Sequence, residues 1–370
     1  MLLVAEGQVL AVLYENAEIQ ELLVQVENRS LPMKAYNYLE LNRKLTVNDR
    51  ITLNTTAVEL GLGTGGRHFV IPDSDFEHIA PDGHIMKLRY TPWQFSVLAA
   101  EEAASPFHER LIEADSLGGT PVIVAPLHSM LPGVILGFRS CLDYTPKVAY
   151  VMTDAAALPI AFSKLVRDLK AKGLLDLTVT TGQAFGGDLE AVSIPSALLT
   201  AYQAIKPDLI IVALGPGIVG TGTKLGFSGV EQSWVLDLAT RLGGVPVAVP
   251  RVSFADLRER HRGISHHSLT ILDLANHPAL IGLSEDLTGE PLETIKNLIK
   301  KHNLWKRHQW YLIKDASEAL KLFYEYDLNV TTMGRGIKDD PWFFRHTIIG
   351  GILAGMARTN RLSSLSRLRE

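Results

Sequence analysis

The sequence of 370 residues contains a single cysteine, Cys141. An intramolecular disulfide is therefore impossible, and zinc or iron–sulfur sites built from several thiolates are excluded within one chain. No uninterrupted apolar run approaches the roughly 18 to 20 residues that a membrane span needs. The first residues show neither the basic start nor the cleavage site of a signal peptide. These absences predict a protein of a reducing, cytoplasmic compartment without a membrane partner.

The sequence also lacks a large excess of charge of either sign. Its 36 lysines and arginines and 40 aspartates and glutamates give a formal net charge of -4, so the whole chain offers no broad electrostatic footprint for nucleic acid. Apolar residues make up 46% and charged residues 21%, which is typical of a globular protein with a sizeable core. The length exceeds the usual size of a single core and predicts two domains.

Residues 1–90 are predicted to form a β-rich domain, a small barrel or sandwich. Short runs with the composition of β-strands occur at residues 8–13, 21–26, 50–53 and 68–71. Turn residues separate these runs at the close spacing of a small antiparallel barrel or sandwich.

Residues 91–370 are predicted to form an α/β domain with a mainly parallel, doubly wound (Rossmann-like) sheet. After a predicted helix over 101–117, apolar runs alternate with amphipathic segments, as in βαβ units. The five predicted strands are 121–125, 148–152, 177–181, 208–214 and 245–249. Residues 310–313 and 328–332 are candidates for two more. In such a sheet the ligand crevice lies beyond the carboxyl ends of the strands, so the site is expected in the loops that follow them.

Polar and glycine residues follow each of the first three strands: His128 and Ser129, then Asp154, then Gly186, Gly187 and Asp188. His128 and Asp154 are candidates for catalytic acid–base groups, and the others for ligand binding. Ser129 also stands where the nucleophile of a hydrolase could stand, although the G-x-S-x-G motif is absent.

The fourth strand leads into a glycine-rich loop over 215–229. Glycines let backbone N–H groups approach an anion closely, which favours phosphate or carboxylate binding. The candidate ligand-binding residues are Gly215, Gly217, Gly220, Thr221, Gly222 and Thr223. The order G-x-G-x-x-G is met formally, but the helix starts too late and on the wrong strand, so a nicotinamide or flavin cofactor is disfavoured. A purely structural turn is the alternative.

The fifth strand leads into residues 251–267, which carry four arginines and three histidines. The guanidinium fork binds phosphate or carboxylate at two points. The candidate ligand-binding residues are Arg251, Arg258, Arg260, His261, Arg262 and His267. A solvated charged loop with internal salt bridges is the alternative.

Ser265 is the predicted N-cap of a helix over 269–274, which places His266 and His267 in its first turn. The helix dipole there favours neutral imidazole, and His266 is the third acid–base candidate. Adjacent helical residues diverge by about 100°, so at most one of the two rings is expected at the site.

A divalent metal remains a possible cofactor. His128, Asp154, Asp188, Asp256 and one histidine of the adjacent pair could form a carboxylate–imidazole centre, although no H-E-x-x-H motif is present.

Four segments together resemble a known family: residues 151–154, 186–191, 215–229 and 258–267. The sequence is similar to an uncharacterised bacterial family, domain-of-unknown-function family 3866. The resemblance covers nearly the whole chain, including residues 333–340, and it implies neither an activity nor a catalytic residue.

The leading functional hypothesis is an enzyme, a hydrolase or transferase, that acts on a small phosphorylated or carboxylated metabolite. The loop 215–229 and the segment 251–262 would hold the anion. The first alternative is a non-catalytic sensor or regulatory protein for such a ligand. The second is a nucleic-acid-binding protein, which is disfavoured because the β domain lacks a basic stripe with aromatic residues. Homo-oligomer formation is left open.

Overall fold

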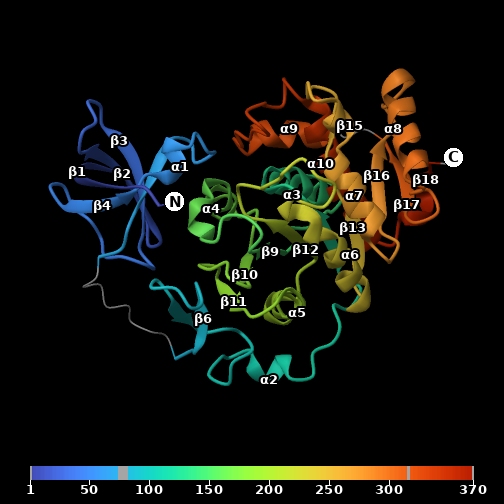
Figure 1. The fold of residues 1–370 in the computed structure, drawn as a ribbon. Helices are drawn as coiled ribbons and strands as arrows, with labels where there is room; N and C mark the ends of the chain where they lie inside the picture. Colours follow the sequence, from blue (N-terminus) through green and yellow to red (C-terminus); the bar gives the residue numbers. More distant parts are fainter. Residues whose placement is uncertain (1, 74–81, 315–316, 369–370) are drawn as a thin grey trace. The chain divides into compact units, whose positions relative to one another are not determined.

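Alternating apolar residues in the N-terminal segment close a five-stranded β-barrel. The computed structural model describes residues 2–73, 82–314 and 317–368. The strand order around the barrel is β1 (Val4–Glu15), β2 (Ile19–Val26), β3 (Met33–Tyr38), β5 (Arg67–Val70) and β4 (Arg50–Asn54) (Figure 1). All neighbours are antiparallel except β3 and β5. The predicted β-rich fold is thereby confirmed as a barrel.

Strand β3 was missed by the prediction from sequence. Its inward positions are Ala35 and Asn37, so it carries little apolar signal. Asn37 is fully buried because its side chain donates to the Gln20 amide oxygen (2.9 Å) inside the barrel. The same unit of the chain, Met1–Val97, also contains α1 (Thr56–Glu59) and a ribbon of β6 (Ile85–Lys87) and β7 (Phe95–Val97).

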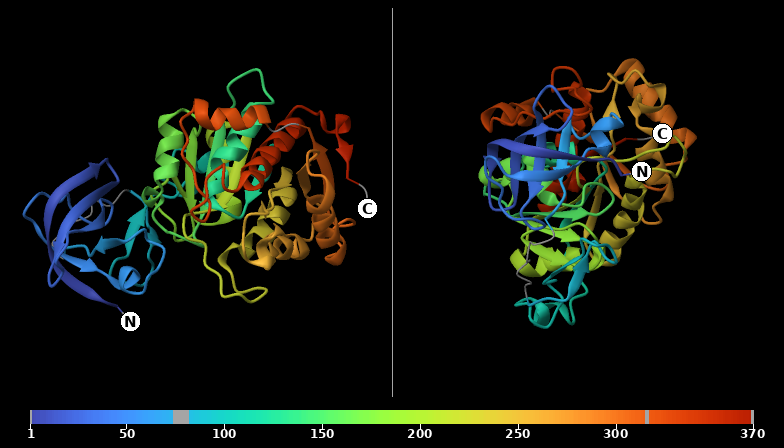
Figure 2. Two further views of the ribbon diagram at one scale, coloured as in Figure 1. Left: turned by 90° about the horizontal axis from the view of Figure 1, so that it is seen from above. Right: turned by 60° about the vertical axis from the view of Figure 1, so that its left-hand side comes forward.

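The second unit, Leu98–Glu370, is built on a nine-stranded, mainly parallel sheet (Figure 2). All five predicted strands are present: β8 (Pro121–Ala125), β9 (Val148–Thr153), β10 (Leu177–Thr181), β12 (Leu209–Leu214) and β13 (Val245–Ala248). The remaining strands are β11 (Leu189–Ala191), β16 (Leu280–Ser284), β17 (Gln309–Ile313) and β18 (Ser366–Arg367). The spatial order is β11-β10-β9-β12-β8-β13-β16-β17-β18, and β18 alone is antiparallel to its neighbour.

Helices cover both faces of this sheet, which explains why its central strands are apolar throughout. One face carries α3 (Leu131–Arg139), α4 (Lys164–Ala171), α9 (Ser317–Glu325) and α10 (Pro341–Arg358). The other carries α5 (Ile194–Ile205), α6 (Gln232–Arg241), α7 (His266–Leu274) and α8 (Gly289–Lys301). The predicted doubly wound α/β class is therefore confirmed. Within the described ranges, no helix is both long and apolar enough to cross a membrane.

Two local predictions were wrong. The expected helix over 101–117 is reduced to α2 (His108–Leu111) between turns, since Pro106 lacks a backbone donor and disfavours a helical Ser105. Residues 328–332 form a loop between α9 and α10 rather than a strand. Leu328 and Val330 are buried in alternation because they pack on the helical layer, not because they pair in a sheet.

The strand order places a crevice at the carboxyl ends of the central strands. Strand β8 lies between β12 and β13. The chain leaves β8 toward α3 on one face, whereas it leaves β12 and β13 toward α6 and α7 on the other. Neighbouring exit loops therefore diverge, which is the condition for a ligand crevice in an open α/β sheet.

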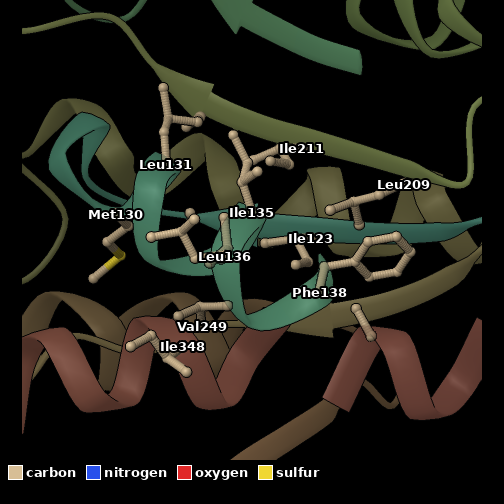
Figure 3. Close-up of a cluster of buried hydrophobic side chains, with 14 of the residues drawn as sticks. Ile123, Met130, Leu131, Ile135, Leu136, Phe138, Leu209, Ile211, Val249 and Ile348 are labelled. Carbon is tan, nitrogen blue, oxygen red and sulfur yellow. The ribbon is translucent and has the colours of Figure 1, made fainter. Parts of the chain in front are cut away.

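Helices α3 and α10 pack against each other in the core of the second unit (Figure 3), and glycines on both helices allow the close approach. A Cβ at Gly137 would lie 2.1 Å from the backbone oxygen of Ile348. We expect Gly137→Ala to lower the free energy of unfolding by about 1–3 kcal/mol, because the helices must separate to admit the methyl group. Urea denaturation measures this loss. Gly336→Ala is the control, since the nearest atom to its Cβ is a carboxylate oxygen at 3.6 Å, and equal losses in the two variants would contradict the explanation.

Candidate functional site

Two adjoining cavities open at the carboxyl ends of β8, β12 and β13. The larger, of about 720 Å³, is lined by the residues that follow β8 and β12, by α4 and by residues 327–333. The smaller, of about 220 Å³, is lined by the glycine-rich loop and by the segment from Arg251 to Ser268. Four residues line both and form a shared wall: Pro126, Leu127, Ile218 and Met333.

Asp256 organises the arginines around the smaller cavity. Its Oδ2 accepts hydrogen bonds from Arg251 (2.9 Å) and Arg258 (3.0 Å), and a longer one from Arg335 (3.5 Å). Arg258 also donates to Oδ1 (3.0 Å), so its contact is two-pronged. Arg258 holds the pKa of the Asp256 carboxyl well below its ordinary value. The predicted internal salt bridges therefore exist, but one carboxylate is shared by three guanidinium groups.

The local charge around this cavity is positive. Arg335 pairs with Asp340 (3.2 Å), which also accepts from the Ser253 hydroxyl (2.7 Å). Two carboxylates thus balance three guanidinium groups in the network. Arg260 lines the cavity and has no carboxylate within ion-pairing distance in the described part of the chain, so it adds an uncompensated cation.

Three histidines cluster on the same cavity. The ring centroids of His266 and His267 lie 4.0 Å apart, and those of His261 and His266 lie 4.9 Å apart. His267 also stacks on Phe227 at 4.1 Å. Burial lowers the pKa of His261 and of His267 to about 4 each and also lowers the pKa of His266, so all three rings are neutral at pH 7.

At most one of His266 and His267 was expected at the site. Both side chains line the smaller cavity. Their Cβ atoms leave the helix in different directions, but in the first turn of α7 the flexible side chains bring the two rings together.

Helix α7 begins at this cavity with Ser265 at its N-cap, as predicted. The Ser265 hydroxyl does not cap the helix and instead contacts Nδ1 of His261 (2.9 Å). The backbone N–H groups of residues 266–268 have no acceptor among the described residues. Unsatisfied N–H groups and the partial positive charge of a helix N-terminus favour a bound anion.

Histidine and carboxylate side chains are not arranged as a metal centre. Within residues 2–73, 82–314 and 317–368, no group of three or more His, Cys, Asp or Glu side chains is placed to hold a metal ion. The candidate ligands Asp154 and Asp188 line neither cavity, whereas the histidine cluster lies among arginines that would repel a cation.

His128 lines the larger cavity, and both of its ring nitrogens have partners. Nδ1 lies 3.3 Å from the backbone oxygen of Leu214, which can only accept, so Nδ1 carries the proton. Nε2 then accepts from the hydroxyl of Ser163 (2.6 Å). The Tyr150 hydroxyl lies 3.3 Å from Nδ1 and donates to the same Leu214 oxygen. Burial lowers the pKa of His128 to about 4, so this ring is also neutral at pH 7.

The exits of β9 and β10 contribute nothing to either cavity. Asp154 accepts from the backbone N–H of Gln183 (2.8 Å). Asp188 pairs with Lys170 and accepts two hydrogen bonds from Thr178. The N–H groups of Gly186 and Gly187 donate to Glu190 (2.7 Å) and Thr180 (3.0 Å). These predicted residues hold their own loop together.

The glycine-rich loop is divided between the two cavities. Gly215 and Gly217 line the larger cavity with Ser129, and Gly220 and Gly222 line the smaller one. The hydroxyls of Thr221 and Thr223 bond to each other (3.1 Å), and Thr221 also donates to the Gly226 oxygen (2.9 Å). Thr221 and Thr223 therefore stabilise the loop itself, as expected if this part of the glycine-rich loop is a structural turn. Neither threonine lines a cavity, and Arg262 also lies outside both cavities.

Two residues of the site were missed from sequence. Ser163 lies well beyond the end of β9, at the N-cap of α4, so a search of strand exits does not reach it. Its only sequence signal is a serine before an amphipathic helix. Arg335 lies between two glycines in the sequence, and only the fold places it against Asp256.

Comparisons with known proteins support the resemblance seen in the sequence. The model of a family described as "Protein of unknown function (DUF3866)" matches residues 34–351. A comparison with curated proteins gave no match.

Proposed function

The chain belongs to the DUF3866 family, whose description assigns no activity, and we propose from its site that it is an enzyme acting on a small anionic metabolite. One observation carries the proposal. Arg251, Arg258 and Arg260 converge with the unsatisfied first-turn N–H groups of α7 on a single cavity. Charge-assisted hydrogen bonds of this kind suit a phosphate or carboxylate group.

The sizes of the two cavities suggest which part of a substrate each cavity would hold. Small-molecule sites usually enclose about 300–1,000 Å³. The larger cavity falls within that range, and the smaller one, at about 220 Å³, suits a single charged group. Asp256 holds two of the arginines in place before a ligand arrives, which lowers the entropy lost on binding.

His266 is the acid–base group of this proposal. Its Nε2 is buried and has no hydrogen-bond partner within the described residues, and its ring lines the anion cavity. A neutral imidazole there can exchange a proton with a bound substrate. A sensor would need the arginines but no such group.

We expect Arg260→Ala to weaken the binding of inorganic pyrophosphate by about tenfold or more, because a hydrogen bond from a charged donor is lost. Isothermal titration calorimetry measures the affinity. Arg262→Ala removes the same charge two residues away, outside both cavities, and serves as the control. Equal weakening in the two variants would indicate diffuse attraction and would count against the cavity as the binding site.

We expect His266→Gln to lower turnover by about 100-fold or more while ligand affinity stays within about threefold. A thermal-shift screen of phosphorylated and carboxylated metabolites identifies ligands through stabilisation. Turnover of the hits is then followed by mass spectrometry, and loss of a general acid or base should cost about 100-fold or more. Ligands that bind at the arginines but are never converted would favour the sensor instead.

A further inference from the structure

His128, which lines the larger cavity, contacts the buried hydroxyl of Ser163, and the anion-binding proposal does not use this pair of a nucleophile and a base. We propose that Ser163 is a catalytic nucleophile for acyl transfer, activated by His128. The substrate would then be an ester or thioester that also carries an anionic group. The inference depends on the proposed function only for the place of that anionic group.

The side chains have the relative geometry that serine nucleophiles require. The Ser163 hydroxyl donates to Nε2 of His128 (2.6 Å), within the range expected for a nucleophile and its base. The Leu214 oxygen accepts from Nδ1 (3.3 Å) and fixes the tautomer in which Nε2 is free to take a proton. It therefore takes the orienting role that a third group plays in such sites.

The N-terminus of helix α4 provides groups that would stabilise the oxyanion formed when Ser163 attacks a carbonyl. Ser163 Oγ accepts from the N–H of Val166 (3.0 Å), which leaves one of its two lone pairs for attack. The N–H groups of Lys164 and Leu165 have no acceptor among the described residues, and both residues line the larger cavity. They lie at the helix N-terminus, where partial positive charge stabilises a developing oxyanion.

Ser163 is only 2% exposed, so bulk water does not reach it directly. Its bonding partner His128 and its neighbours Lys164 and Leu165 all line the larger cavity. A reacting group must therefore enter through that cavity. An anionic group held in the adjoining cavity would direct the carbonyl of the same molecule across the shared wall.

The chemistry balances with water as the second reactant. Oγ of Ser163 forms a bond to the carbonyl carbon while its proton passes to Nε2 of His128. The bond from that carbon to the leaving oxygen or sulfur then breaks, and Nε2 returns the proton to the leaving group. A water molecule, deprotonated by His128, hydrolyses the acyl-serine and restores the Ser163 hydroxyl.

The simpler interpretation is that Ser163 only caps α4. Labelling with a short-chain fluorophosphonate distinguishes a capping serine from a nucleophilic one. This probe phosphonylates serines that a base activates. We expect one adduct per folded chain, mapped to Ser163 by peptide mass spectrometry. His128→Gln should slow labelling by about 100-fold or more, and unfolding of the wild type in urea should abolish it without any substitution.

Ser193→Ala is the matched control, because Ser193 caps α5 and bonds Ser196 rather than a histidine. Its labelling rate should equal that of the wild type, and melting temperatures verify that each variant is folded. No adduct, an adduct on another serine such as Ser129, or wild-type labelling of His128→Gln would overturn the inference. Failure of Arg260-dependent pyrophosphate binding would instead overturn the proposed function and leave the labelling of Ser163 unchanged.

Discussion

Asp256→Ala is expected to lower the free energy of unfolding by about 3–5 kcal/mol, the usual cost of removing one partner from a buried ion pair. The side chains of Arg251 and Asp256 are 7% and 3% exposed. Within the described residues Arg251 has no other carboxylate at ion-pairing distance, so the substitution leaves its charge buried without an ion-pair partner. Urea denaturation at pH 7 measures the loss, and the affinity for pyrophosphate should fall because the arginines lose their common anchor.

Asp273→Ala provides the comparison for this result. Asp273 also pairs with two cations, Lys224 (3.2 Å) and Arg307 (3.0 Å), but its side chain is 29% exposed. Solvent-exposed pairs contribute about 0–1 kcal/mol, so this loss should be small. Similar losses in the two variants would show that burial of the Asp256 network is not what stabilises it.

The fold was largely predictable because its strands are buried on both faces. A strand covered by helices on each side must be apolar along its whole length, and β8 and β12 stand out for that reason. Strand β16 was missed because Gly282 interrupts its short apolar run. A Cβ at Gly282 would lie 2.5 Å from the side chain of Ile349 on α10, so this position requires glycine. The requirement comes from tertiary packing, which the local sequence does not reveal.

The candidate site was predictable only in part, since its assembly depends on strand order. His128, the glycine-rich loop and the segment from Arg251 to His267 were predicted because they follow strands, and those three strands are adjacent in the sheet. Asp154 and Asp188 were predicted on the same ground, but their strands lie farther from β13. Pairing of β8 with both β12 and β13 decides which exits meet, and long-range packing rather than any local motif fixes that pairing.

Acidification is expected to destabilise the protein strongly between pH 6.5 and pH 4. Burial lowers the pKa of His128, His261, His267 and His346 to about 4 each. An unfolded histidine titrates near pH 6.5. Below that pH these histidines bind protons in the unfolded chain but remain neutral in the folded chain until the pH approaches 4. The stabilisation is therefore complete above pH 6.5, decreases as the pH falls through this window, and levels off below pH 4.

His346→Leu isolates one of these contributions away from the cavities. His346 is 2% exposed on α10, where its Nδ1 donates to the Trp342 oxygen (2.9 Å) and its Nε2 has no partner in the described part of the chain. Between pH 7 and pH 5 one such histidine should account for about 2 kcal/mol of lost stability. Urea denaturation at pH 7 and at pH 5 gives the loss in the free energy of unfolding on acidification, and this loss should be smaller by about that amount in the variant than in the wild type. The quantity to compare is the change in the free energy of unfolding between pH 7 and pH 5, because the leucine also alters stability at pH 7. If this change is the same in the variant and the wild type, His346 does not titrate in this window.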